Sequence, residues 1–181
     1  MTTYVAFLRA INVGGHAVVK MIDLRDAFTT AGCKNVRSLI ASGNMLFEAP
    51  AGSTEVLVRR IQGKLSALMG EAPVLFLRTM REMERLVASA PFKKFEAKPW
   101  LKLYVAFLSQ KPRQRPRFPL RSAPEALEVI EMKNREAFIV SGKKKNGLSG
   151  FPNLFIEKQL GVAATSRNWS TIKKIVLAAA P

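Results

Sequence analysis

The chain is poor in the residues that most often carry out chemistry. Its 181 residues include one cysteine, Cys33, and one histidine, His16. A single cysteine excludes an intramolecular disulfide, and a zinc site needs several Cys or His ligands. No partner base or nucleophile stands near His16, and Cys33 beside Gly32 is typical of buried packing. The sequence therefore predicts no metal and no cofactor, assigns no catalytic residue, and leaves an enzymatic activity open.

Long apolar runs are also missing. Residues 4–8 are apolar, but Arg9 interrupts them before the 7–15 residues that a signal peptide requires. No stretch approaches the roughly 20 apolar residues of a membrane-spanning helix. We therefore expect a cytoplasmic protein without a membrane partner, and the single cysteine fits a reducing compartment. The sequence indicates no oligomeric state.

Acidic residues are scarce relative to basic ones. The chain has 13 Asp and Glu against 29 Lys and Arg, a net charge of +16. Residues 1–90 hold 11 basic and 7 acidic side chains, a net of +4, whereas residues 91–181 hold 18 and 6, a net of +12. A positive field attracts polyanions such as nucleic acid. The alternative explanation is a basic bias shared by a whole proteome.

What the chain does contain is an internal echo. The pentapeptide Tyr-Val-Ala-Phe-Leu occurs at residues 4–8 and again at residues 104–108, which indicates two similar halves. Apolar spacing and turn residues predict, for the first half, strand 3–11, helix 21–31, strands 36–41 and 45–48, helix 54–69 and strand 73–78. The order β-α-β-β-α-β is the split βαβ pattern of ferredoxin-like folds.

The second half repeats this pattern imperfectly. Its expected elements are a bridging helix over 79–90, strand 101–109, a proline-rich segment over 111–121, a helical turn over 122–127, strands 127–132 and 137–141, and helices over 153–160 and 168–179. The last strand is expected to be short or absent around 162–164. We predict an α+β fold of two ferredoxin-like (split βαβ) subdomains from an imperfect internal duplication, plus a C-terminal helix. The expected boundaries are residues 1–78, a bridging helix and linker over 79–100, and residues 101–181.

Four segments carry a resemblance to a known family. They are residues 8–15 followed by Lys20, Met21 and Leu24; residues 42–44 followed by Phe47; residues 156–158 with 160–161; and residues 165–169. With these motifs in this order, the chain resembles the domain of unknown function 1697 family of bacterial proteins from residue 4 to about residue 176. The resemblance implies two ferredoxin-like α+β subdomains. It implies no activity, because the family name records none.

Three polar segments, residues 12–20, 42–44 and 165–168, could together bind an anionic small molecule. The glycine loop 12–20 joins a strand to a helix N-terminus, whose free N–H groups can hold an anion, although its spacing matches no nucleotide-binding motif. Residues 165–168 could cap the last helix and present an arginine there. Simple chain reversal, capping and a hairpin turn are the structural alternatives. The residues that this hypothesis brings to one cleft are Arg9, Asn12, Gly14, Gly15, Lys20, Ser42, Asn44, Arg167 and Asn168.

Two basic runs lead to the favoured hypothesis, non-covalent binding of nucleic acid or another phosphate-bearing partner. Clustered cations neutralise phosphates, and prolines hold the first run extended. Solvated loops are the structural alternative. An RNA-binding sheet of the ferredoxin type would carry two or three aromatics on its central strands, whereas the equivalent strand of each half has one, Phe47 or Phe138. The cations concerned are Arg113, Arg115, Arg117, Arg121, Lys143, Lys144 and Lys145.

Overall fold

The protein is described from a computed structural model. The structure describes residues 1–9, 19–40, 43–71, 73–96, 98–114 and 116–179. Within them the chain forms two antiparallel sheets and five helices, which confirms the predicted α+β class. The chain divides into two compact units: unit 1 comprises Met1–Arg85 and Ile175–Pro181, and unit 2 comprises Leu86–Lys174.

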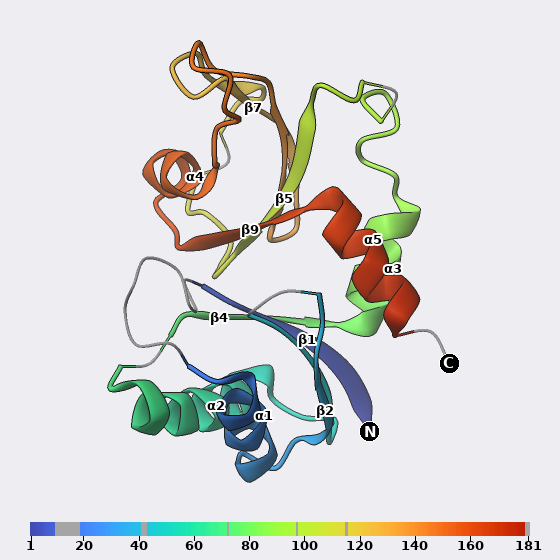
Figure 1. Ribbon diagram of the computed structural model, residues 1–181, viewed down its shortest axis with the longest axis vertical. Helices are drawn as coiled ribbons and strands as arrows, with labels where there is room; N and C mark the ends of the chain where they lie inside the picture. Colours follow the sequence, from blue (N-terminus) through green and yellow to red (C-terminus); the bar gives the residue numbers. More distant parts are fainter. Residues whose placement is uncertain (10–18, 41–42, 72, 97, 115, 180–181) are drawn as a thin grey trace. The chain divides into compact units, whose positions relative to one another are not determined.

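Unit 1 is built around a four-stranded sheet (Figure 1). The first copy of the pentapeptide lies in the central strand, which pairs antiparallel with a neighbour on each side. Because this strand is covered on both faces, residues 5–8 can be apolar without alternation. Its strands are β1 (Thr2–Leu8), β2 (Lys34–Ser38), β3 (Asn44–Ala49) and β4 (Leu75–Thr79), in the order β2-β3-β1-β4.

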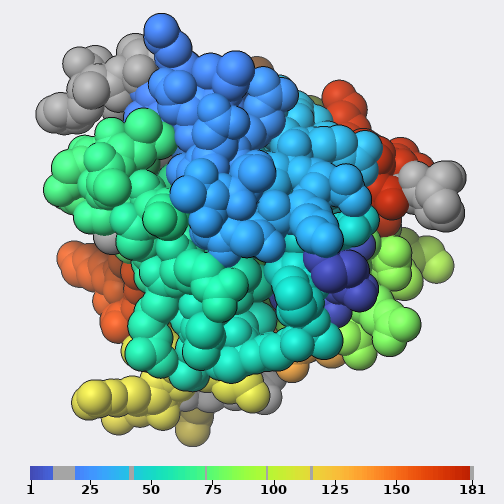
Figure 2. Space-filling view, turned by 90° about the horizontal axis from the view of Figure 1, so that it is seen from below, coloured from blue at the N-terminus to red at the C-terminus, as the bar shows by residue number. Residues whose placement is uncertain are grey.

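Two helices cover one face of this sheet, α1 (Met21–Thr30) and α2 (Thr54–Met69). Figure 2 shows their outer surfaces side by side, α1 in blue and α2 in teal. Leu24 and Phe28 of α1 and Ile61 and Leu65 of α2 repeat at a spacing of four residues, so each pair lies on one helix face and enters the core. The predicted element order of the first half is thus the observed one.

Unit 2 contains a five-stranded sheet in the order β6-β7-β8-β5-β9. The second copy of the pentapeptide lies in β5, which pairs antiparallel with β8 and β9. Helix α4 packs beside β9 (Figure 1). The elements are β5 (Lys102–Leu108), β6 (Leu120–Ser122), β7 (Leu127–Lys133), β8 (Glu136–Ser141), α4 (Asn153–Leu160) and β9 (Ala164–Asn168).

Two expectations for the second half are wrong. The expected helical turn over 122–127 is instead the end of β6 followed by a turn. The last strand is a full strand, and it contains residues 165–168, which the sequence had suggested as a helix cap. Thr and Ser favour caps locally, but pairing of β9 with buried β5 overrides that preference.

Two further helices each follow a strand without a loop. Helix α3 (Met80–Ala88) begins directly after β4, and α5 (Trp169–Ala178) begins directly after β9. Thr79 and Glu82 form a capping box at the start of α3: the Thr79 N–H donates to Glu82 Oε2 at 2.7 Å, and the Glu82 N–H donates to Thr79 Oγ1 at 3.2 Å. In both units, therefore, the final strand and the helix after it are one continuous segment.

Candidate polyanion interface

The proline-rich segment 111–121 crosses the surface of unit 2. As predicted, its described residues form no helix, and regular structure resumes only at β6. Arg113, Arg117 and Arg121 are exposed, while Arg115 lies outside the described residues. Arg121 faces Glu128 across the β6–β7 pair, and its Nε donates to Glu128 Oε2 at 3.2 Å. One cation of the run is therefore partly neutralised.

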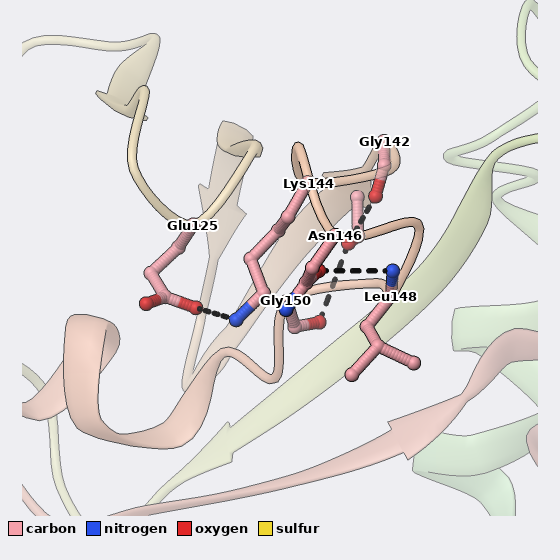
Figure 3. Close-up of polar contacts among 7 residues, drawn as sticks. Glu125, Gly142, Lys144, Asn146, Leu148 and Gly150 are labelled. Carbon is pink, nitrogen blue, oxygen red and sulfur yellow. Dashed lines mark hydrogen bonds and ion pairs between the residues drawn. The ribbon is translucent and has the colours of Figure 1, made fainter.

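The second basic run lies on a closed turn over residues 142–150 (Figure 3). Residues 143 and 149 form an antiparallel bridge. Inside it, the Lys144 N–H donates to the Leu148 carbonyl at 2.8 Å, and the Leu148 N–H donates to Asn146 Oδ1 at 3.1 Å. At the base, the Ser141 hydroxyl lies 3.2 Å from the Gly142 carbonyl and 3.3 Å from that of Gly150. These bonds fix the backbone that carries three consecutive lysines.

This turn is anchored to the residues that follow β6. Lys144 Nζ donates to Glu125 Oε2 at 3.2 Å (Figure 3). The Gly142 N–H donates to the Ala126 carbonyl at 2.8 Å. A Cβ at Gly150 would clash with the Glu125 carbonyl oxygen, so only glycine permits this close approach. The two basic runs consequently meet at the turn over 123–126.

Carboxylates engage only part of the positive charge of the two basic runs. Glu125 and Glu128 each engage one cation, Lys144 and Arg121 respectively. Four other cations of the two runs are exposed. Among the residues the structure describes, no carboxylate lies within 4.0 Å of any of the four. That set, here called the free cations, is Arg113, Arg117, Lys143 and Lys145.

Arg167 and Asn168 are the last two residues of β9, and Asn168 directly precedes Trp169, where α5 begins. Arg167 Nη1 donates to Thr165 Oγ1 and to the Ser166 carbonyl, both at 2.9 Å. Burial lowers the pKa of Arg167 to about 10, so the guanidinium is still charged at neutral pH. Asn168 is exposed, opposite Tyr104 of β5. Arg167 is therefore embedded in its own sheet.

Arg78 is an equivalent residue that sequence reasoning missed. It lies opposite Val5 in β1, as Arg167 lies opposite Val105 in β5. Its Nη1 donates to the preceding carbonyl, Leu77, at 2.8 Å, and the residue is only 2% exposed. The sequence does contain one feature that relates Arg78 to Arg167: each arginine stands two residues before the apolar residue that begins a helix.

The other predicted ligand residues belong to unit 1. Asn12, Gly14, Gly15 and Ser42 lie outside the described residues. Lys20 is exposed and precedes α1. Asn44 is buried, and its Nδ2 donates to the Leu39 carbonyl at 3.2 Å, closing the β2–β3 turn. The Leu8 N–H donates to the Gly43 carbonyl, and the Arg9 N–H donates to the Val74 carbonyl. These bonds place Arg9 at the same end of the sheet as the β2–β3 turn.

Reactive side chains contribute little to these surfaces. Cys33 is buried, and burial raises the pKa of its thiol to about 11, with Arg60 opposing part of that rise. The thiol is therefore protonated at neutral pH. Within the described ranges, no three His, Cys, Asp or Glu side chains gather as metal ligands would. Phe47 and Phe138 are buried, so neither offers a free ring on its sheet.

In the part of the chain that the structure describes, no helix combines the length and the apolar character needed to cross a bilayer.

Comparison with known proteins gives a family and a fold. Residues 1–138 match the model of the family described as "Protein of unknown function (DUF1697)". The solved structure of a conserved bacterial protein from Streptococcus pneumoniae is similar, with a TM-score of 0.67 and 20% identity over 97% of each chain. At that identity the likeness concerns the fold alone. The curated proteins contain no match.

Proposed function

The chain belongs to this family of proteins of unknown function, and from that premise we propose that unit 2 binds a phosphate-bearing polyanion such as nucleic acid. The observation that carries the proposal is the set of free cations, of which Lys143 and Lys145 lie on the turn bonded to residues 125 and 126. Exposed Lys and Arg without carboxylate partners are available to neutralise phosphates and release counterions. Residues 86–174 hold 18 basic and 6 acidic side chains, so the surrounding field favours the same ligand.

The turn geometry supports this role for two lysines. Lys143 and Lys145 flank Lys144, whose ammonium is held by Glu125. The central lysine thus fixes the turn, while its neighbours remain exposed. A rigid turn binds a polyanion with less loss of conformational entropy than a free loop would.

The test is retention on immobilised double-stranded DNA and RNA across a salt series. The variant K143Q/K145Q should reduce the slope of log affinity against log salt by about 2, or about 1 per lost phosphate contact. The matched control is K34Q/R37Q, which removes two exposed cations of β2 in unit 1 and should leave the slope close to wild type. No retention at low salt, or an equal effect of the two double variants, would overturn the proposal.

A small anionic ligand is the second candidate. The observation in its favour is the position of Arg9 at the end of the sheet where β1 ends and β3 and β4 begin. Backbone hydrogen bonds hold this end of β1 beside Gly43 and Val74. A thermal-shift screen against nucleotides and inorganic phosphate tests this candidate, since a ligand of the native state raises the melting temperature. The variant R9Q should abolish such a shift.

We further propose that the two units arose by duplication of one ferredoxin-like module. The support is topological: β7-β8-β5-β9 repeats the strand order β2-β3-β1-β4, and the pentapeptide occupies the same strand in both. The main difference is the first crossover, which is α1 in unit 1 and contains β6 in unit 2. A structure-based alignment that pairs Val5 with Val105 should also pair Arg78 with Arg167. A better superposition in another register would contradict common descent.

A further inference from the structure

We propose that the segment 93–102 of unit 2 is a stacking site for single-stranded nucleic acid, with the indole of Trp100 receiving a base. This inference deepens the proposed function and rests on it for the class of ligand. It adds a second contact, separate in sequence from the free cations, and it narrows the ligand from any polyanion to one with exposed base faces.

Trp100 is the central observation. Its side chain is 60% exposed, whereas Trp169, the other tryptophan, is 4% exposed and packs edge-on against Phe92 with ring centroids 5.3 Å apart. Tryptophan offers a large apolar surface, and leaving it in water is unfavourable. The exposed indole is therefore available to a partner with a flat apolar face.

The surroundings of Trp100 are cationic. Four lysines of the segment are exposed: Lys93, Lys94, Lys98 and Lys102. The single acidic residue, Glu96, accepts hydrogen bonds from Trp169 Nε1 at 2.8 Å and from Lys173 Nζ at 3.2 Å, so its charge is engaged by α5. The charge beside Trp100 is thus complementary to a phosphate backbone.

Successive turns order the backbone of the described residues 92–96 and 98–101. The N–H groups of Phe95 and Lys98 donate to Phe92 and Phe95 at 2.7 and 3.0 Å, and the Leu101 N–H donates to Lys98 at 3.0 Å. Phe92 anchors these turns in the core. The Leu101 bond closes a turn that contains Trp100 and begins at Lys98. Trp100 and Lys98 consequently belong to one hydrogen-bonded turn.

This combination fits single strands better than the alternatives. Single-strand binding pairs a basic surface with aromatic rings on which bases stack, whereas a duplex keeps its base faces hidden. Insertion into a membrane requires a contiguous apolar surface, and here one indole stands among lysines. The second aromatic of the segment, Phe95, already has the Lys98 ammonium 5.8 Å from its ring centroid. One base per segment is the expected stoichiometry of stacking.

The experiment measures binding of fluorescein-labelled dT15 by anisotropy, together with quenching of tryptophan fluorescence. W100A should bind dT15 about tenfold more weakly, since stacking contributes of the order of one such factor per base. W100F should retain most of the affinity, and L154A, which removes another exposed apolar side chain of unit 2, should match wild type. A 15-base-pair duplex and inorganic polyphosphate should bind wild type and W100A equally.

The outcomes separate this inference from the proposed function. If W100A and wild type bind dT15 equally while K143Q/K145Q lowers the salt slope, the stacking site is wrong and the polyanion surface stands. If no polyanion binds at low salt, both fail. A blue shift of tryptophan emission on phosphatidylserine vesicles, without an effect of W100A on dT15, would assign the segment to a membrane surface instead. Unchanged circular dichroism and melting temperature confirm that W100A is folded.

Discussion

The two units share a strand order but differ at their first crossover. In unit 1, β1 is connected to β2 through α1, whose buried residues Leu24 and Phe28 join the core. In unit 2, β5 is connected to β7 through the segment 109–119 and the short strand β6. The segment holds three prolines, Pro112, Pro116 and Pro119, which are incompatible with a regular helix in their place.

This difference shows which part of the strand arrangement varies between the units. The central strand, its two partners and the buried arginine opposite its valine are common to both units. The crossover is not, and three described arginines lie where unit 1 has its helix. Phe118 and Leu120 of this crossover pack against the core of unit 2, whereas its arginines are exposed and can carry charge. The crossover without a helix is thus one of the basic parts of unit 2.

The largest expected effect tests whether the repeated strand contributes equally to the free energy of unfolding in both units. Phe7 and Phe107 occupy the same place in the pentapeptide, and both are fully buried. F7A and F107A should each lower the free energy of unfolding by about 3–5 kcal/mol, the usual cost of emptying a buried phenylalanine site. Urea denaturation measures it, with K102A as the exposed control. A loss below about 1 kcal/mol at one site would break the equivalence.

The next effect concerns the paired arginines. Removing either side chain deletes hydrogen bonds to buried acceptors and leaves a void, at an expected cost of about 2–3 kcal/mol. R78A should cost more than R167A, because Arg78 is almost fully buried and Arg167 keeps part of its surface in solvent. R78M and R167M retain the packing of the stem and should recover part of the loss. Equal stability of R78A and R78M would show that packing of the stem contributes nothing, and equal stability of R78M and wild type would show that the guanidinium contributes nothing.

A smaller effect distinguishes the two hairpin turns. Ile40 in the β2–β3 turn has φ +66°, and Asn134 in the β7–β8 turn has φ +56°. Asparagine tolerates this left-handed region, whereas a β-branched residue is strained there by about 1–2 kcal/mol. I40N should therefore raise the free energy of unfolding by about 1 kcal/mol, since Ile40 is exposed and loses little packing. N134I should lower it by a similar amount. Changes of the same sign in the unfolding free energies of I40N and N134I, measured by urea denaturation, would contradict this prediction.

The parts of this comparison that depend on apolar pattern could be predicted from sequence. The echo located β1 and β5, and the spacing of Leu24 and Phe28 or Ile61 and Leu65 located the helices. Strand β9 was missed because Thr165 and Ser166 have the local preferences of a helix cap, and only pairing with β5 decides otherwise. The strand order itself follows from long-range pairing, to which local pattern contributes little.

The candidate site was predictable in composition and less so in detail. The count of cations identified the basic runs, but it could not separate Lys144 and Arg121, which carboxylates engage, from Lys143 and Arg117. That distinction depends on Glu125 and Glu128, which only the fold brings close. The burial of Arg78 was missed for the same reason, because an arginine in a sequence is read as exposed unless its acceptors are known.

The smallest effect concerns how each unit holds the first turn of the helix after its last strand. Helix α3 uses its own Glu82, whereas α5 uses Glu96 from outside the helix. Hydrogen bonds from the Trp169 indole and then the Lys173 ammonium lower the pKa of the Glu96 carboxyl below 4.5. A lowered pKa in the folded state means that the stabilisation is complete above the unfolded value and is lost as pH falls through the folded one.

Wild type should therefore be slightly more stable than E96Q at pH 7, and the difference should vanish well below pH 4.5. Melting temperatures between pH 3 and 8 measure it, and E131Q, which alters an exposed carboxylate of β7, should show no such trend. The gap should also shrink in high salt, since both partners of the Glu96–Lys173 pair are about half exposed. A gap that grows toward low pH would mean that Glu96 destabilises unit 2 as a carboxylate, and α5 would then need another anchor than the Trp169 indole bond.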